Sequence, residues 1–366
     1  MAFFTDTQSK KKARRTAAAL APAAALVLLL AVPAIGPRAL VQDLFMVLTL
    51  LVLALNWNLL AGFAGLVSVG QQAFVGVGAY TLFAAVILGG WDPLAGILAA
   101  GAAAMLCAVP MAFFAFRLHG AYFAIGTWVA AEIARLALAQ WKALGGGTGT
   151  SLPKGAVNAM AGVQAVKGWL GIGSAAAADA LAYWLALLLA AATLAASYAF
   201  LRSRPGLGLQ AVRDNPEAAR SVGVDPLRLK AQVFLLTAFG TGVCGALLFL
   251  QITRVTPETA FSVVHWTAFV IFVVVIGGIG TLPGPIVGVA VFYALQRLLS
   301  DYGTAYLIVL GAVGIATMLF ARRGLWGLLC DRTGIELLPL RQRPPAPPAA
   351  RTPLPKENTT HDPILH

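Results

Sequence analysis

Residues 213–223, Arg-Asp-Asn-Pro-Glu-Ala-Ala-Arg-Ser-Val-Gly, form a short polar stretch between two long apolar segments. Asp214 or Asn215 can cap the start of a helix, and Pro216 suits the first helical position. Gly223 can adopt the left-handed conformation that ends a helix, which predicts about two turns. Such a short helix is not stable alone in water, so this chain or another protein must hold it. It is either an ordinary capped loop helix or a docking helix.

The docking interpretation assigns a role to each side of this helix. Ala218, Ala219 and Val222 fall on one side and are small enough to seat in a groove on a partner. Charged residues flank them and can form ion pairs with that partner. The residues predicted to make the contact are Arg213, Asp214, Glu217, Ala218, Ala219, Arg220, Val222 and Gly223.

The composition is that of an integral membrane protein. Of 366 residues, 59% are hydrophobic and only 11% are charged, too few to cover a soluble domain of this size. The formal net charge of +12 resides in clusters beside apolar runs, without the aromatic and basic interleaving of a nucleic-acid-binding surface. The three cysteines, Cys107, Cys244 and Cys330, are widely spaced and predict neither a disulfide framework nor a metal site.

Long apolar runs predict an all-α, polytopic transmembrane helical bundle with about ten spans, since a span needs about 20 apolar residues. The Lys/Arg clusters lie on one side if the N- and C-termini are both cytoplasmic. The first run also resembles a signal peptide, although the first span of a multi-pass protein can serve as the signal itself. The predicted spans are 17–34, 39–60, 72–89, 93–116, 119–140, 180–201, 231–251, 263–281, 284–300 and 304–321.

This topology gives a domain organisation. Residues 1–16 form a basic cytoplasmic N-terminus, and residues 17–325 form the transmembrane domain. Within that domain the polar segment 202–230 is cytoplasmic. Residues 326–366 are predicted to be a Pro-rich cytoplasmic tail that is disordered.

Two Gly-rich stretches, 61–80 and 276–292, interrupt the helical pattern. Irregular backbone at membrane depth is tolerated where protein buries it or where it lines a cavity. Paired breaks in two halves of a chain point to a translocation pathway, and close helix packing through small residues is the alternative role for most of the glycines. The polar residues predicted to line the pathway are Ser68, Gln71, Gln72 and Thr127.

Glu132 and Arg135 are ionisable residues within a predicted span. They are three residues apart, so they share a helix face and can neutralise each other. We expect a structural ion pair, and lining of the pathway is the alternative role.

Several strings follow one another through residues 40–330: Gly65-Leu-Val-Ser-Val-Gly-Gln-Gln, Tyr122-Phe-Ala-Ile, Glu132-Ile-Ala-Arg, Gly145-Gly-Gly-Thr, Ala211-Val-Arg-Asp-Asn-Pro-Glu-Ala-Ala-Arg-Ser-Val-Gly and Ile276-Gly-Gly-Ile-Gly-Thr-Leu-Pro-Gly-Pro. Together they resemble the LivM-type permeases of bacterial branched-chain amino acid ABC transporters. The stretch from Glu217 to Gly223 also resembles the coupling motif of ABC importers, Glu-Ala-Ala-x-x-x-Gly. It lacks the Ile-x-Leu-Pro that follows in the longer form of that motif.

The resemblance implies an inner-membrane permease subunit without catalytic residues. Its partners would be two cytoplasmic ATPase subunits, a sister permease and a periplasmic substrate-binding protein. ATP would be used by those subunits and no cofactor bound by this chain, which contains no Gly-x-x-x-x-Gly-Lys-Ser/Thr motif. The expected substrate is a branched-chain or other apolar amino acid. A permease for urea or small amides is an alternative, and an ion-coupled secondary transporter or channel is another.

Overall fold

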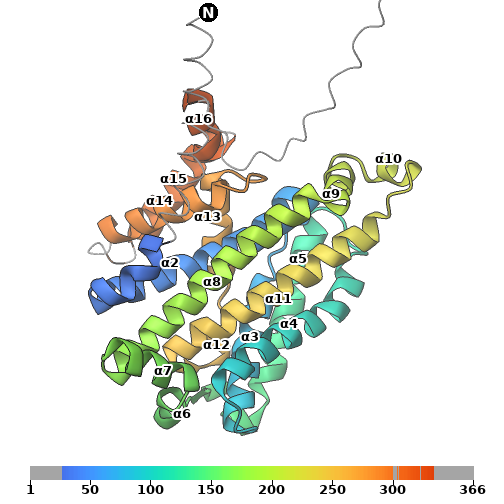
Figure 1. Cartoon of the computed structure of the whole chain (residues 1–366). Helices are drawn as coiled ribbons and strands as arrows, with labels where there is room; N and C mark the ends of the chain where they lie inside the picture. The colour runs from blue at the N-terminus through green and yellow to red at the C-terminus, as the bar shows by residue number, and fades with distance from the viewer. Residues whose placement is uncertain (1–26, 300–302, 304, 322, 334–366) are drawn as a thin grey trace, which may run out of the picture.

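The computed structural model describes residues 27–299, 303, 305–321 and 323–333. Nearly all of this part of the chain is helical, which confirms the all-α class (Figure 1). In chain order the elements are α2 (Arg38–Asn58), η1 (Leu59–Phe63), α3 (Gln71–Ile87), α4 (Pro93–Ala115), α5 (Ala121–Ala139), η2 (Lys142–Leu144), η3 (Gly146–Thr148), β1 (Thr150–Ser151), α6 (Lys154–Asn158), α7 (Ala161–Leu170), α8 (Ser174–Arg202), α9 (Arg204–Asp214), α10 (Pro216–Ser221), α11 (Pro226–Ile252), β2 (Arg254–Val255), α12 (Pro257–Ala260), η4 (Val264–Ala268), α13 (Phe269–Gly277), α14 (Gly284–Leu299), α15 (Ala305–Phe320) and α16 (Gly324–Thr333).

Six helices of the described chain are long and apolar enough to cross a membrane. They are Arg38–Phe63, Pro93–Ala115, Ala121–Ala139, Ser174–Arg202, Pro226–Ile252 and Pro257–Gly277. A seventh is counted if Leu307–Phe320 and Gly324–Arg332, which are bent by 50°, form one span. The apolar helices α3 and α14 are shorter. Each predicted span from 39–60 onward falls on a helix, most of 17–34 lies outside the described residues, and ten crossings stay a prediction.

The sequence Asp, Asn or Thr followed by Pro begins four of these helices. Asp92 Oδ1 accepts the N–H of Leu94 at 2.8 Å at the start of α4. Asp225 caps α11 in the same way, and Thr256 begins α12 with a capping box. Proline at the first helical position lacks only an N–H that has no helical partner. These caps determine the helix starts, and they explain why α11 begins at Pro226, ahead of the apolar run from 231 that predicted it.

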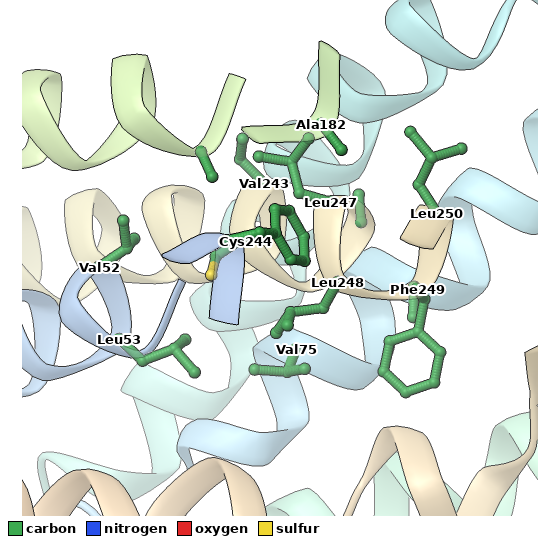
Figure 2. Packing of buried hydrophobic residues seen from close by; sticks show 14 of the residues in the cluster. Val52, Leu53, Val75, Ala182, Val243, Cys244, Leu247, Leu248, Phe249 and Leu250 are labelled. Atoms are coloured by element: carbon green, nitrogen blue, oxygen red, sulfur yellow. The ribbon is translucent and has the colours of Figure 1, made fainter. Parts of the chain in front are cut away.

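Helix α11 is the centre of the bundle and packs against α2, α3, α4 and α8. Figure 2 shows the side chains of its Val243–Leu250 stretch between Val52 on α2, Val75 on α3 and Ala182 on α8. Glycine allows the closest of these approaches: a Cβ added to Gly78 would lie 2.1 Å from the carbonyl oxygen of Gly242. Close packing, the alternative considered for the Gly-rich stretches, is therefore the role of Gly78.

The chain beyond the last predicted span corrects one expectation. Helix α16 covers residues that were predicted to belong to a disordered tail, 326–366. It packs against α13 and α14, and Trp326 is buried. Gly324 (φ +71°) makes the approach possible, because a Cβ there would come within 2.3 Å of Gly278 Cα. The predicted tail from residue 334 onward lies outside the described residues, as does the basic segment 1–16.

The loop between α5 and α8 folds over one end of the bundle. Strand β1 pairs antiparallel with β2, with Thr150 opposite Val255, while α7 packs on α8. The η3 turn and α12 both pack against α5. Helix α10 lies at the opposite end of the bundle (Figure 1). The two ends are called below the α7 end and the α10 end.

Candidate coupling site and polar breaks

Helices α9 and α10 connect α8 to α11, and α10 is the predicted capped helix. Asn215 Oδ1 accepts hydrogen bonds from the N–H groups two and three residues later, both at 3.1 Å. Pro216 occupies the first helical position. Gly223, at φ +84°, ends the turn, and its N–H donates to the carbonyl three residues earlier at 2.9 Å. The capped helix is confirmed, and Asn215 rather than Asp214 is its cap.

Most residues of the predicted contact are accessible on this connector. The exposed ones are Arg213, Asp214, Glu217, Ala218, Arg220, Val222 and Gly223. Ala219 is only 2% exposed, on a helix that packs against α9 and α11 of the same chain. This corrects the expectation that Ala218, Ala219 and Val222 together face a partner. Ala219 holds α10 on the bundle, and the open surface is formed by charged side chains around Val222.

Arg213 reaches from α9 to the first Gly-rich stretch. Its Nη1 donates to the carbonyl oxygen of Gly62 in η1 at 2.8 Å. Its Nε and Nη2 both donate to Asp214 Oδ1 at 3.1 Å. One guanidinium group therefore contacts both the exposed connector and the interrupted end of α2.

The two Gly-rich stretches meet at Gly62 and Gly280. A Cβ added to Gly62 would lie 2.5 Å from the backbone nitrogen of Gly280, so the contact requires glycine. Asn58 joins the same two segments: its Oδ1 accepts the N–H of Gly280 and its Nδ2 donates to the carbonyl of Thr281, both at 2.8 Å. We call Asn58, Gly62, Gly280 and Thr281 the glycine junction. The sequence pattern predicted the glycines and missed Asn58, because the asparagines of this apolar run, Asn56 and Asn58, have no spacing that identifies a partner.

The four predicted pathway residues are all buried around the non-helical residues 65–70. Thr127 Oγ1 accepts the N–H of Val69 at 3.1 Å, and Ser68 Oγ accepts the N–H of Gly70 at 3.2 Å. These two hydroxyl groups replace hydrogen bonds that a regular helix would provide.

The glutamines hold the same break to other helices. Gln71 Nε2 donates to Thr241 Oγ1 on α11 at 2.7 Å. Thr267 Oγ1 in η4 donates to Gln72 Oε1 at 2.5 Å. Buried polar groups are normally paired, and among the described residues Gln71 Oε1 is left without a partner. The four side chains are thus brought together as supports of one break.

The ion pair predicted on α5 is confirmed. Arg135 Nη2 donates to Glu132 Oε1 at 2.5 Å, and Nε lies 2.9 Å from both carboxylate oxygens. Helix α5 rests on α3 and α4. Its buried side carries Phe123, Thr127 and Ala131. Glu132 is turned from that side, with 45% of its side chain exposed, and Arg135 borders it, with 26% of its side chain exposed.

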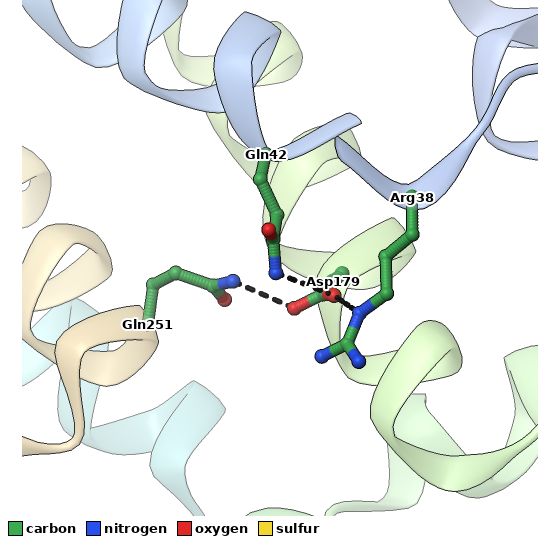
Figure 3. Close-up of polar contacts among 4 residues, drawn as sticks. All are labelled: Arg38, Gln42, Asp179 and Gln251. Atoms are coloured by element: carbon green, nitrogen blue, oxygen red, sulfur yellow. Dashed lines mark hydrogen bonds and ion pairs between the residues drawn. The ribbon is translucent and has the colours of Figure 1, made fainter. Parts of the chain in front are cut away.

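The carboxylate of Asp179 is buried at the α7 end, and the sequence pattern did not predict a role for it. Asp179 on α8 forms an ion pair with Arg38 on α2 (Figure 3). Its oxygens also accept from Gln42 Nε2 at 3.0 Å and from Gln251 Nε2 on α11 at 2.6 Å. This Asp179 cluster connects three long helices. Its members are distant in sequence, so no spacing predicted it.

The described part of the chain holds no group of three His, Cys, Asp or Glu side chains that could bind a metal ion. Cys107, Cys244 and Cys330 are free thiols. In the described residues the polar side chains discussed above act through ion pairs and hydrogen bonds at the helix breaks and in the α9–α10 connector.

A bundle of long apolar helices with polar breaks and an exposed, capped connector defines a multi-pass membrane permease. Residues 39–321 match the model of the family described as branched-chain amino acid transport system / permease component, and the chain belongs to this family. It is 30% identical over 317 residues to the high-affinity branched-chain amino acid transport system permease protein LivM of Salmonella typhimurium, covering 82% of this chain and 73% of the relative. LivM of Escherichia coli matches with the same identity and coverage. No solved structure matches the chain.

Proposed function

We propose that this chain is a permease subunit of an ABC importer in the bacterial inner membrane, and that it translocates branched-chain or other apolar amino acids. The family description and the names of the two LivM relatives support the substrate class. The chain itself would be no enzyme and bind no nucleotide. Two cytoplasmic ATPase subunits would hydrolyse ATP, and a periplasmic protein would capture the substrate.

In this proposal the α10 end is cytoplasmic and the α7 end faces the periplasm. The segment 202–230 contains six Lys and Arg residues, which favour the cytoplasmic side. Both termini would then be cytoplasmic. A sister permease would complete the pathway, and the breaks around Ser68, Gln71, Gln72 and Thr127 would be the parts of this chain that rearrange during transport.

The hydrogen bond from Arg213 to Gly62 is the observation that carries the proposal. An ATPase that binds the exposed charges of α10 would move α9 with it. Arg213 would pass this movement to η1, and the glycine junction would pass it to the segment between α13 and α14. Glycine contacts and single amide hydrogen bonds suit such a junction, because no bulky side chains lock the two segments together.

The test is purification of the chain with its partners, followed by reconstitution in liposomes. We expect ATPase subunits to copurify, and ATP-dependent, vanadate-sensitive uptake of a branched-chain amino acid when the binding protein is present. Uptake driven by an ion gradient in the chain alone would instead indicate a secondary transporter. ATP-dependent uptake of urea with no amino acid uptake would assign the other ABC substrate class.

A further inference from the structure

Helix α5 carries its charged pair near the side that this chain leaves uncovered. It is the least buried of the six span-length helices. The exposed arc also contains Ile125, 54% exposed, and Trp128, 49% exposed. Trp128 lies one helical turn before Glu132, so an aromatic surface adjoins the ion pair.

The depth of the pair restricts what can cover it. At 1.5 Å per residue, Glu132 lies about 10 Å along the axis from the end of α5 at Ala139. Ionisable groups at such depth face protein or a water-filled cavity rather than hydrocarbon. The exposed sides of other span-length helices carry apolar residues such as Leu106 on α4 and Leu188 on α8, which suit lipid. Helix α5 also exposes Ile133, so it is the ion pair that distinguishes its face. The α5 face therefore points to an aqueous path.

This face is also near the predicted point of substrate entry. Helix α12 and the η3 turn pack on α5 at the α7 end. Glu258 of α12 is close enough to act electrostatically on Arg135. In the proposed orientation, an amino acid released outside the membrane would reach this pair early in its passage.

We propose that Glu132 and Arg135 form a transient binding site for the zwitterionic group of an amino acid, an inference that rests on the proposed import function. The substrate ammonium binds the Glu132 carboxylate, and the substrate carboxylate binds the Arg135 guanidinium. The bonds to Glu132 use Nε and Nη2, which leaves Nη1 directed to other acceptors. Trp128 and Ile125 provide an apolar surface for the substrate side chain.

The charges make this binding reversible. The resting ion pair and the zwitterion are each neutral overall, so the complex adds no net charge to the membrane interior. One internal ion pair is exchanged for two with the substrate, and it forms again when the substrate leaves. A neutral amide such as urea offers no such exchange, so the site favours amino acids.

The first test uses the neutral double variant Glu132→Gln/Arg135→Gln in the complete transporter. We expect uptake of a branched-chain amino acid to fall about tenfold or more, because charge-assisted hydrogen bonds to the substrate are lost. Capture of the substrate by the separate binding protein should be unchanged. A purely structural pair predicts the opposite, since two neutral residues are easier to place in a membrane. Uptake within twofold of wild type would overturn the proposal.

Asp43→Asn/Arg297→Gln, which removes another ion pair, is the matched control and should import normally.

The second test measures access of water to this face. Trp128→Cys should react with a charged, membrane-impermeant thiol reagent faster than Leu188→Cys and the native thiols, and a branched-chain amino acid should slow the reaction. Equal, slow labelling at both positions would refute the aqueous path. A wild-type complex without ATP-driven uptake would instead refute the proposed function, whereas normal uptake by the neutral double variant refutes the zwitterion site alone.

Discussion

Arg213 Nη1 donates a hydrogen bond to the carbonyl oxygen of Gly62, 151 residues earlier in the chain. The donor is on the polar connector that precedes α11, and the acceptor is at the interrupted end of α2. Helix α9 also packs on η1, and the Arg213 side chain lies beside Gly65 and Gly280. A substitution of Arg213 should therefore affect the transmission of movement from the α9–α10 connector to η1 more than it affects the stability of either segment.

The first prediction concerns this bond. Arg213→Ala should lower amino acid uptake several-fold while leaving the binding protein's substrate affinity unchanged. A hydrogen bond from a charged donor contributes about 1.5–3 kcal/mol, and partial exposure of Arg213 favours the lower end. ATP hydrolysis should be measured with and without substrate, alongside uptake. We expect substrate to stimulate hydrolysis less in the variant than in the wild type. Arg254→Ala, at the α7 end, is the control. Wild-type coupling in Arg213→Ala would exclude this route of transmission.

The second prediction tests whether the α10 surface is covered by a partner. A Cβ added to Gly223 meets no atom within 4 Å, so the side chain of Gly223→Trp starts without a clash at its Cβ. It should nevertheless abolish transport by obstructing the bound ATPase. The left-handed backbone alone costs a non-glycine residue about 1–2 kcal/mol. Gly90→Trp shares the positive φ and the open surroundings, and it lies in the turn between α3 and α4. If both variants assemble and import equally well, Gly223 is not at a partner surface.

The third prediction concerns close packing in the centre of the bundle. Gly78→Ala should destabilise the protein by about 1–3 kcal/mol, because its new methyl group would displace the α11 backbone at Gly242. Thermal unfolding in detergent, followed by tryptophan fluorescence, measures the effect. Gly168→Ala in α7, where a Cβ meets no atom within 4 Å, should leave the unfolding temperature unchanged or raise it. A Gly78→Ala protein as stable as wild type would show that the helices are more loosely packed.

The fourth prediction addresses the Asp179 cluster. Asp179→Asn should lower the free energy of unfolding by about 1–3 kcal/mol, since Arg38 and two amide donors lose a common carboxylate. The value is moderate because the Arg38 side chain is 55% exposed and can be solvated. Asp331→Asn removes a mostly exposed ion pair and should change stability by less than about 0.5 kcal/mol. Equal melting temperatures for the two variants would contradict a role of the cluster in holding the helices together.

Local patterns predicted the parts of the structure that local chemistry determines. Asn215 and Pro216 located the start of α10, and the spacing of Glu132 and Arg135 predicted their ion pair. The hydrophobic runs located the helices, but they did not determine how many times the chain crosses the membrane. Burial of Ala219 could not be read from α10 alone, because it depends on where α9 and α11 place that helix.

Long-range partners were not predictable for a physical reason. The residues next to Asn58, Asp179 and Gln251 in the sequence are those of ordinary apolar helices. Their hydrogen-bond partners are distant in sequence and come close only when the bundle packs. Trp326 gave a similar error: its segment was assigned to a disordered tail by the prolines that follow it. The glycines of the junction were assigned to the two Gly-rich stretches, but their contact with each other was not predicted.

The Asp179 cluster also bears on how the protein is made. Arg38 leaves the ribosome 141 residues before Asp179, and Gln251 follows Asp179 by another 72. The start of α2 therefore enters the membrane with a charge whose partner has not yet been synthesised. Since chains are made and begin to assemble from the N-terminus, Arg38 can pair with Asp179 only after α8 is made, and the bond from Gln251 completes the cluster at the α7 end only when α11 is made. The attachment of α2 to both α8 and α11 at this end is thereby completed late in synthesis.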